Sequence, residues 1–125
     1  VVGNGMPKVG TDFAVPDHGL KHMMEAYDSV EMDHVLFGHI GDNHLHLNLL
    51  PKDQDELDFA KEMYRELALM AVSLGGTVSA EHGIGKIKKE LLAEMLGDAV
   101  IDSFRSLKSK LDPNWILGRG ILFSE

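Results

Sequence analysis

The sequence predicts an α+β fold, a ferredoxin-like split βαβ unit with an antiparallel sheet and extra C-terminal helices. Two observations predict this class: strand-like apolar segments alternate with segments in which apolar residues recur every three or four positions, and the first six segments follow the order β-α-β-β-α-β. The expected strands are 11–16, 33–40, 44–50 and 77–80. The expected helices are 17–32, 53–74, about 87–96 and 98–111.

Each element has its own local pattern. The stretch TDFAVP at 11–16 alternates short apolar residues and stops at a proline, which suits a strand. Segments 33–40 and 44–50 are expected to form a hairpin, because the residues between them tolerate positive φ. The long helix at 53–74 ends at two glycines, after which the short strand TVSA leads into a glycine-rich loop.

Length and composition indicate one globular domain. The 125 residues suit a single domain, expected at 11–125, after a linker or arm at 1–10 that holds three of the thirteen glycines. The net charge of -8 and the lack of a long basic run argue against a nucleic-acid partner. The chain starts without methionine, so we expect a processed or excised piece.

The sequence offers neither a membrane span nor a disulfide framework. No apolar stretch approaches the roughly 20 residues that cross a bilayer, and the start lacks the shape of a signal peptide. We therefore expect a cytoplasmic protein, with peripheral attachment at the inner membrane as the alternative. Because the chain has no cysteine, any metal site must use His, Asp or Glu.

The stretch FGHIGDNHLHLNLLP at 37–51 carries three histidines. A two-residue turn at Asp42 and Asn43 would place His39 opposite His46, with Cβ atoms about 4.5–5.5 Å apart. Two such imidazoles can bind one divalent ion, whereas hydrogen-bonded histidines on a solvated sheet face are an equal alternative. Alternation places three further residues on the same face, opposite to the leucines: Phe37, His44 and Asn48.

A second candidate stretch, GGTVSAEHGIGK at 75–86, presents Glu81 and His82 where a strand would end. Loops on a rigid scaffold commonly carry chemistry. Together with His39 and His46, Glu81 would give two imidazoles and one carboxylate, a set that leaves an open coordination position, as in catalytic metal sites. On spacing alone, a polar loop whose glycines only make a turn remains the alternative.

At these residues the sequence resembles the C-terminal domain of FAD-linked oxidases, a family that includes D-lactate dehydrogenases, the glycolate oxidase flavoprotein subunit and D-2-hydroxyglutarate dehydrogenase. The family pattern G-H-x-G-D-G-N-x-H-x-N is matched by Gly38, His39, Gly41, Asp42, His46 and Asn48. The pattern G-G-x-x-S-x-E-H-G-x-G is matched by Gly75, Gly76, Ser79, Glu81, His82, Gly83 and Gly85. The tail pattern L-D-P-N-G-I-L-N-P-G is matched by Leu111 to Asn114, Ile116, Leu117 and Gly120.

The resemblance implies a role for each matching polar residue. His39, His46 and Glu81 would bind a divalent metal, zinc or manganese. His82 would be the general base that takes the hydroxyl proton of a D-2-hydroxy acid, and Asn48 would lie near the substrate carboxylate. The substrate would transfer a hydride to the flavin and become a 2-oxo acid.

The resemblance also implies that part of the enzyme lies outside this chain. In the family FAD is bound mainly by a separate N-terminal domain, and no dinucleotide site is recognisable here. The expected partners are an FAD-binding domain or subunit and a small 2-hydroxy acid, and the isolated chain would be inactive. The alternative is a non-catalytic metal-binding or partner-binding module that keeps the fold.

The chain departs from the family patterns at several positions. Asn43 replaces a turn glycine and is the next most tolerant residue for positive φ. His44 replaces an asparagine, and it would either perturb the ligand set or be solvated; we expect the second. Trp115 replaces another turn glycine, and Gly118 and Arg119 replace Asn-Pro, so the final loop is expected to differ.

Overall fold

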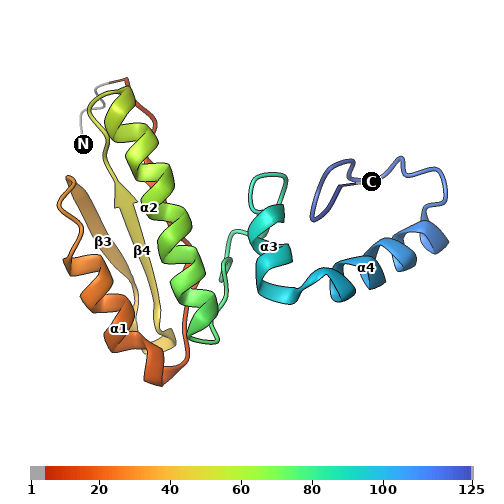
Figure 1. Cartoon of the computed structure of the whole chain (residues 1–125), viewed down its shortest axis with the longest axis horizontal. Coiled ribbons are helices and arrows are strands. Elements are labelled where there is room, and N and C mark those ends of the chain that lie inside the picture. The colour runs from red at the N-terminus through yellow and green to blue at the C-terminus, as the bar shows by residue number, and fades with distance from the viewer. Residues whose placement is uncertain (1–4, 125) are drawn as a thin grey trace. The chain divides into compact units, whose positions relative to one another are not determined.

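The computed structural model describes residues 5–124, which divide between Glu81 and His82 into two compact units (Figure 1). The first unit contains, in chain order, β1 (Val9–Gly10), β2 (Phe13–Ala14), α1 (Asp17–Asp28), β3 (His34–His39), the 3-10 helix η1 (Ile40–Asp42), β4 (His44–Leu49) and α2 (Gln54–Ser73). The second unit contains α3 (Lys89–Leu96) and α4 (Asp98–Leu111).

A four-stranded antiparallel sheet is the framework of the first unit. β4 is its central strand: β3 pairs with β4 on one side, and β1 and β2 pair with it on the other. An isolated bridge between Ala14 and Thr77 extends the sheet beyond β2. α1 and α2 contact each other and lie on one side of the strands (Figure 1). This arrangement confirms the predicted mixed fold class.

The hydrophobic core lies between the leucine face of β4 and the two helices. Leu47 and Leu49 are fully buried, and Leu45 lies beside Met23 and Tyr27 of α1. α2 adds buried residues of its own: Leu57, Ala60, Leu67, Ala68 and Ala71. The alternation along β4 therefore directs its leucines into the core and its histidines to the opposite face.

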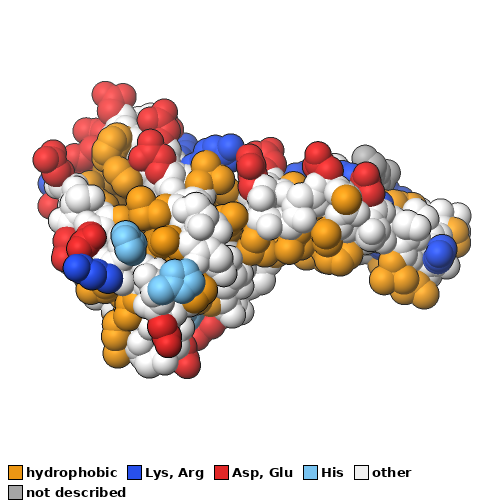
Figure 2. All heavy atoms as spheres, turned by 60° about the horizontal axis from the view of Figure 1, so that its bottom comes forward, with side chains coloured by type: hydrophobic (Ala, Val, Ile, Leu, Met, Phe, Trp, Pro, Cys, Tyr) orange, Lys and Arg blue, Asp and Glu red, His pale blue; other side chains and the backbone are white. Residues whose placement is uncertain are grey.

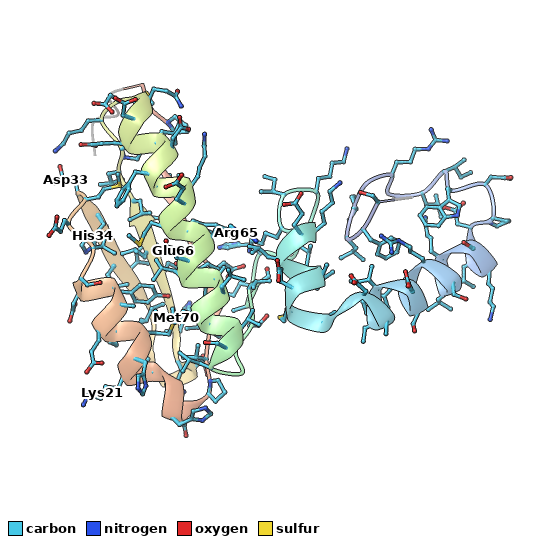
Figure 3. All side chains as sticks on the ribbon, in the orientation of Figure 1. Lys21, Asp33, His34, Arg65, Glu66 and Met70 are labelled. Atoms are coloured by element: carbon cyan, nitrogen blue, oxygen red, sulfur yellow. The ribbon has the colours of Figure 1, made fainter. Side chains whose placement is uncertain are left out.

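The helices form where the periodicity predicts them, with small differences at their ends. α2 begins after Asp53, whose carboxylate accepts the backbone N–H of Glu56 at 2.9 Å. Its outward face carries Glu66 and Met70 (Figure 3). α1 ends at Asp28 instead of position 32, and α3 begins at position 89 instead of 87.

The hairpin between β3 and β4 differs from the predicted two-residue turn. Residues 40–42 form η1, and Asn43 adopts the left-handed conformation (φ 50°) that was expected of a residue in place of a glycine. This longer loop pairs His39 with His44 and Phe37 with His46, so the predicted pairing of His39 with His46 is wrong. Because the register differs by two residues, the histidines still share one face.

The strand predicted at 11–16 begins earlier and is interrupted. β1 already pairs with β4 inside the segment expected to be a linker or arm, whose residues 1–4 lie outside the described part of the chain. Between β1 and β2, Thr11 and Asp12 leave the regular ladder although the register on either side is the same. The cause lies in their side chains, which take over backbone hydrogen bonds.

The strand predicted at 77–80 does not form. The hydroxyl of Thr77 accepts the N–H of Ser79 at 3.2 Å, and the N–H of Glu81 donates to the carboxylate of Asp12 at 3.1 Å. Side-chain oxygens thus replace the backbone partners that a strand would need. The segment nevertheless runs beside β2 and brings Glu81 to the sheet.

The second unit consists of two helices and an irregular tail. The carboxylate of Asp112, directly after α4, accepts the N–H groups of Ile116 at 3.1 Å and Leu117 at 2.9 Å. The hydrogen bond from Lys108, together with these N–H groups, lowers the pKa of Asp112 from its ordinary value. The matching Asp of the tail pattern therefore holds the turn that ends α4.

Hydrophobic side chains of the second unit remain uncovered on one face (Figure 2). A groove of about 350 Å³ is lined mainly by Phe104, Leu107, Leu111, Leu117, Leu122 and Phe123. Across residues 5–124, none of the helices combines the length and the apolar character that a membrane crossing requires.

Gly76, just after α2, has no room for a side chain. A Cβ atom there would lie 2.3 Å from the carbonyl oxygen of Ala14 and 2.8 Å from that of Ala71. We expect Gly76→Ala to lower the free energy of unfolding by about 1–3 kcal/mol through overpacking, measured by urea denaturation. Gly41→Ala is the control, because a Cβ at Gly41 would meet nothing within 4 Å. Equal losses in the two variants would contradict the steric explanation.

Candidate metal centre

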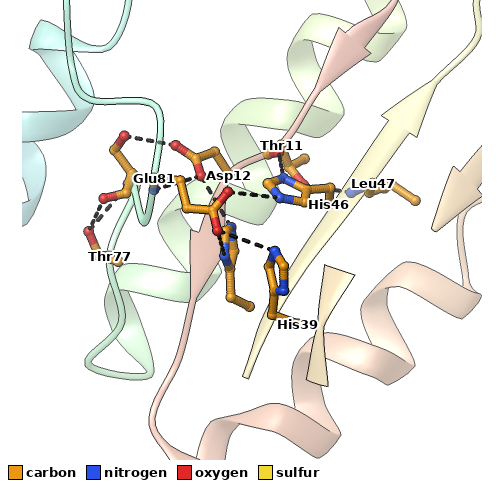
Figure 4. Close-up of polar contacts among 9 residues, drawn as sticks. Thr11, Asp12, His39, His46, Leu47, Thr77 and Glu81 are labelled. Atoms are coloured by element: carbon orange, nitrogen blue, oxygen red, sulfur yellow. Dashed lines mark hydrogen bonds and ion pairs between the residues drawn. The ribbon is translucent and has the colours of Figure 1, made fainter. Parts of the chain in front are cut away.

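The face of β4 opposite to the leucines carries a cluster of imidazole and carboxylate groups (Figure 4). His39 comes from the end of β3, His44 and His46 come from β4, and Glu81 comes from the segment after α2. All four residues belong to the first unit. Figure 4 shows the Glu81 side chain directed toward the rings of His39 and His46.

Three imidazole nitrogens converge on the Glu81 carboxylate. Nε2 of His39 lies 3.3 Å from Oε1, Nδ1 of His44 lies 3.7 Å from Oε1, and Nε2 of His46 lies 3.7 Å from Oε2. One possible ligand atom from each of His39, His46 and Glu81 lies within 4.8 Å of the other two. The two distances of 3.7 Å are too long for hydrogen bonds, so the groups face one another across a small gap.

The cluster has a buried floor and an open side. His44 and His46 are 3% and 7% exposed. The side chains of His39 and Glu81 are 58% and 46% exposed. An ion or a small molecule can therefore approach from the side of His39 and Glu81, while the other two rings are shielded from water.

The second nitrogen of His46 binds the backbone. Its Nδ1 lies 3.1 Å from the carbonyl oxygen of Thr11. Because a carbonyl oxygen can only accept, Nδ1 carries the hydrogen, and in the neutral ring Nε2 keeps its lone pair toward Glu81. Histidines that bind metals commonly donate their other N–H in this way, which fixes both tautomer and ring orientation.

The carbonyl of Thr11 is available for this bond because the Thr11 hydroxyl replaces it in the hydrogen-bond pairing with β4. The N–H of Leu47 donates to Oγ1 of Thr11 at 2.9 Å, and the N–H of Thr11 donates to the carbonyl of Leu47, also at 2.9 Å (Figure 4). The side-chain oxygen therefore stands where the backbone oxygen of a regular strand would stand. This substitution is the reason that the edge segment is split into β1 and β2.

Asp12 is a buried carboxylate that connects three parts of the cluster. It is 2% exposed. Its Oδ1 accepts from Nε2 of His44 at 3.2 Å and from the backbone N–H of Glu81 at 3.1 Å. Its Oδ2 accepts from the hydroxyl of Ser79 at 2.8 Å. A carboxylate at this depth requires such donors, since an unpaired buried charge is strongly unfavourable.

Tyr64 of α2 is influenced by the negative charge of Asp12. Burial, with the charge of Asp12 as a further cause, raises the pKa of Tyr64 to about 12. The Tyr64 hydroxyl therefore stays protonated at physiological pH. It therefore adds no negative charge beside Asp12.

The cluster fits a divalent transition-metal ion. Ligand bonds of about 2.0–2.2 Å place neighbouring ligand atoms about 3.0–3.5 Å apart. The three separations across the gap, 3.3, 3.7 and 3.7 Å, lie within this range or a few tenths of an ångström beyond it. Imidazole and carboxylate are donors that zinc accepts, and carboxylate also suits manganese. Small side-chain movements would close the set around one ion.

The predicted ligand residues His39, His46 and Glu81 meet in the structure, although through a different strand register. The expectation that His44 is solvated is wrong. His44 lies on the central strand, opposite His39 on one side and Ala14 on the other, so neighbouring strands cover it.

Two other predicted residues follow members of this cluster in the chain. Asn48 lies two residues after His46 on β4, and its amide oxygen accepts from the ammonium group of Lys8 at 3.2 Å. His82 follows Glu81 and is the first residue of the second unit. Its role as the general base stays a prediction.

Sequence reasoning missed Thr11, Asp12 and Ser79, which position the cluster. The signal for Asp12 was a carboxylate inside an apolar strand segment, where burial requires hydrogen-bond donors. No comparable signal marked Thr11, because threonine is common in strands. Ser79 matches the family pattern, but its partner lies 67 positions earlier in the chain.

Comparison with known proteins identifies the family. The model of the family described as "FAD linked oxidases, C-terminal domain" matches residues 3–122. The chain therefore belongs to this family, and the predicted resemblance is confirmed.

Several curated relatives are similar to this chain. It is 31% identical over 120 residues to the "Glycolate oxidase subunit GlcD" of Bacillus subtilis, covering 91% of this chain and 26% of that protein. It is 40% identical over 97 residues to a D-2-hydroxyglutarate dehydrogenase of Xanthomonas citri pv. viticola, covering 74% of this chain and 21% of that protein. It is 33% identical over 116 residues to a D-lactate dehydrogenase of Anaerostipes hadrus, covering 87% of this chain and 24% of that protein. The chain thus spans about a quarter of the length of these relatives.

We expect Asp12→Ala to lower the free energy of unfolding by about 3 kcal/mol or more, because several buried donors lose a charged acceptor. Urea denaturation of the full chain measures this loss. Asp28→Ala removes an exposed carboxylate at the end of α1 and should change stability by about 0.5 kcal/mol or less. A similarly small effect in Asp12→Ala would contradict its connecting role.

Proposed function

We propose that this domain binds the divalent metal and the substrate of an FAD-dependent dehydrogenase or oxidase of D-2-hydroxy acids. The observation that supports this most is the convergence of His39 and His46 on Glu81, at 3.3 and 3.7 Å. The names of the relatives refer to glycolate, 2-hydroxyglutarate and lactate. Each of these compounds carries a hydroxyl group beside a carboxylate, and such a group can bind a metal ion.

The polar residues suit the oxidation of such a hydroxyl group. A divalent ion in the cluster, zinc or manganese, would supply positive charge beside the hydroxyl oxygen and favour loss of its proton. His82, in the loop after Glu81, would accept this proton as the general base. The hydrogen on C2 would leave with its electron pair to the flavin, which converts the 2-hydroxy acid to the 2-oxo acid.

Asn48 and Lys8 suit the carboxylate of the substrate. The exposed ammonium group of Lys8 is bound to the amide oxygen of Asn48. Gly10 opposite leaves space for this amide, since a Cβ at Gly10 would lie 2.7 Å from its oxygen. A carboxylate that binds beside this pair would gain a charge-assisted hydrogen bond.

The flavin would be held by a part of the enzyme outside this chain. The chain covers about a quarter of its relatives, and the matching family is that of a C-terminal domain. We propose an FAD-binding domain or subunit as the partner of this domain. We propose the cytoplasm as its location, with peripheral attachment at the inner membrane as the alternative.

Metal content tests the proposed ligands. After incubation with zinc or manganese and removal of free ion, we expect about one bound ion per chain by elemental analysis. His39→Ala and Glu81→Ala should each release it, because each removes one of three donors. His34→Ala is the matched control: His34 lies at the other end of β3, where its Nδ1 contacts the carbonyl of Met32. Full occupancy in both ligand variants would refute this ligand set.

Substrate binding is tested by thermal unfolding. A ligand of the native state raises stability, by about 2.7 kcal/mol at one hundred times its Kd. We expect D-lactate, glycolate, D-malate or D-2-hydroxyglutarate to raise the Tm only of the metal-loaded chain, and Asn48→Ala to reduce the shift without loss of metal. Asn114→Ala, in the exposed tail, is the control. Absence of any shift with all four acids would favour the non-catalytic module instead.

A further inference from the structure

We propose that His44 is a third imidazole ligand of the metal centre and that Asp12 is the residue that positions it. This inference rests on the proposed function, because it concerns the same metal ion. It adds a residue that the two-histidine, one-glutamate ligand set does not contain. The position is one at which the family pattern carries asparagine.

The two ring nitrogens of His44 point to different carboxylates. Nε2 of His44 lies 3.2 Å from Oδ1 of Asp12, so this nitrogen donates to the buried carboxylate. Nδ1 lies 3.7 Å from Oε1 of Glu81, the same separation that His46 has from Oε2. Both rings therefore present one nitrogen to Glu81 and donate the other N–H to a fixed acceptor, the arrangement that holds metal-binding histidines.

The gap between His44 and Glu81 also suits a shared ion. Because Nε2 carries the hydrogen, Nδ1 of the neutral His44 ring is an acceptor and cannot donate to the Glu81 carboxylate. The separation of 3.7 Å thus lies between two acceptors, which a bound cation would stabilise. It is only a few tenths of an ångström longer than the spacing of about 3.0–3.5 Å between two ligands of one ion.

The three imidazole rings pack closely together. The ring centroids of His44 and His46 lie 4.3 Å apart with the planes at 65°, and that of His39 lies 5.8 Å from His44. His44 is 3% exposed, so few other orientations are open to it. A third imidazole in this place would favour ions with a high affinity for nitrogen donors, zinc above manganese.

X-ray absorption at the zinc edge of the zinc-loaded full chain counts the imidazole ligands directly. We expect a signal that fits three imidazoles in the wild-type chain and two in His44→Asn. A bound zinc ion with only two imidazoles in the wild type would overturn the role of His44 but leave the proposed metal centre standing. A wild-type chain that binds no divalent ion would overturn both.

Chelator competition gives an independent readout. We expect His44→Asn to weaken zinc binding by about 100-fold or more and manganese binding by less, and Asp12→Asn to weaken zinc binding by about 10- to 100-fold. Circular dichroism of the metal-free variants establishes that they are folded, and His34→Asn is the control. Zinc affinity in folded His44→Asn equal to that of the control would overturn the proposal.

Discussion

The candidate site depends on the hydrogen bonds that the buried carboxylate of Asp12 accepts. This carboxylate accepts from His44 on β4, from the Ser79 hydroxyl and from the backbone of Glu81. One side chain thus connects the central strand to the segment after α2. An ionised carboxylate at this depth is strongly unfavourable without donors, so the three partners are held together or lost together. Glu81 is therefore in place although the segment that carries it forms no strand.

Thr11, the residue before Asp12, orients His46 as Asp12 orients His44. Its hydroxyl takes the N–H of Leu47, which leaves its carbonyl for Nδ1 of His46. Regular pairing is lost at two adjacent residues, and in exchange the orientations of His44 and His46 are fixed. Departures from regular secondary structure are expected at functional sites, where local preference and function conflict. The leucine core beneath β4 supports these orientations, because strands position side chains more firmly than loops.

The domain suggests a division of tasks within a longer flavoprotein. We propose that this chain contributes the metal ligands and the general base, while the flavin is bound elsewhere in the assembly. The open side of the cluster, at His39 and Glu81, is where substrate and flavin would have to approach. The buried side, at His44 and His46, would then hold the ion.

The sequence by itself determined the class of fold, the face of β4 on which the histidines lie, the left-handed conformation of Asn43 and the ligand candidates His39, His46 and Glu81. These features follow from period-two alternation, local turn preferences and motif spacing, all of which are properties of neighbouring residues. Only the tertiary structure decided the hairpin register, the loss of the strand at 77–80, the burial of His44 and the role of Asp12. Each of these depends on hydrogen bonds between residues far apart in the chain, such as Asp12 with Glu81. A local sequence pattern does not indicate which distant group will pair with a buried donor or acceptor.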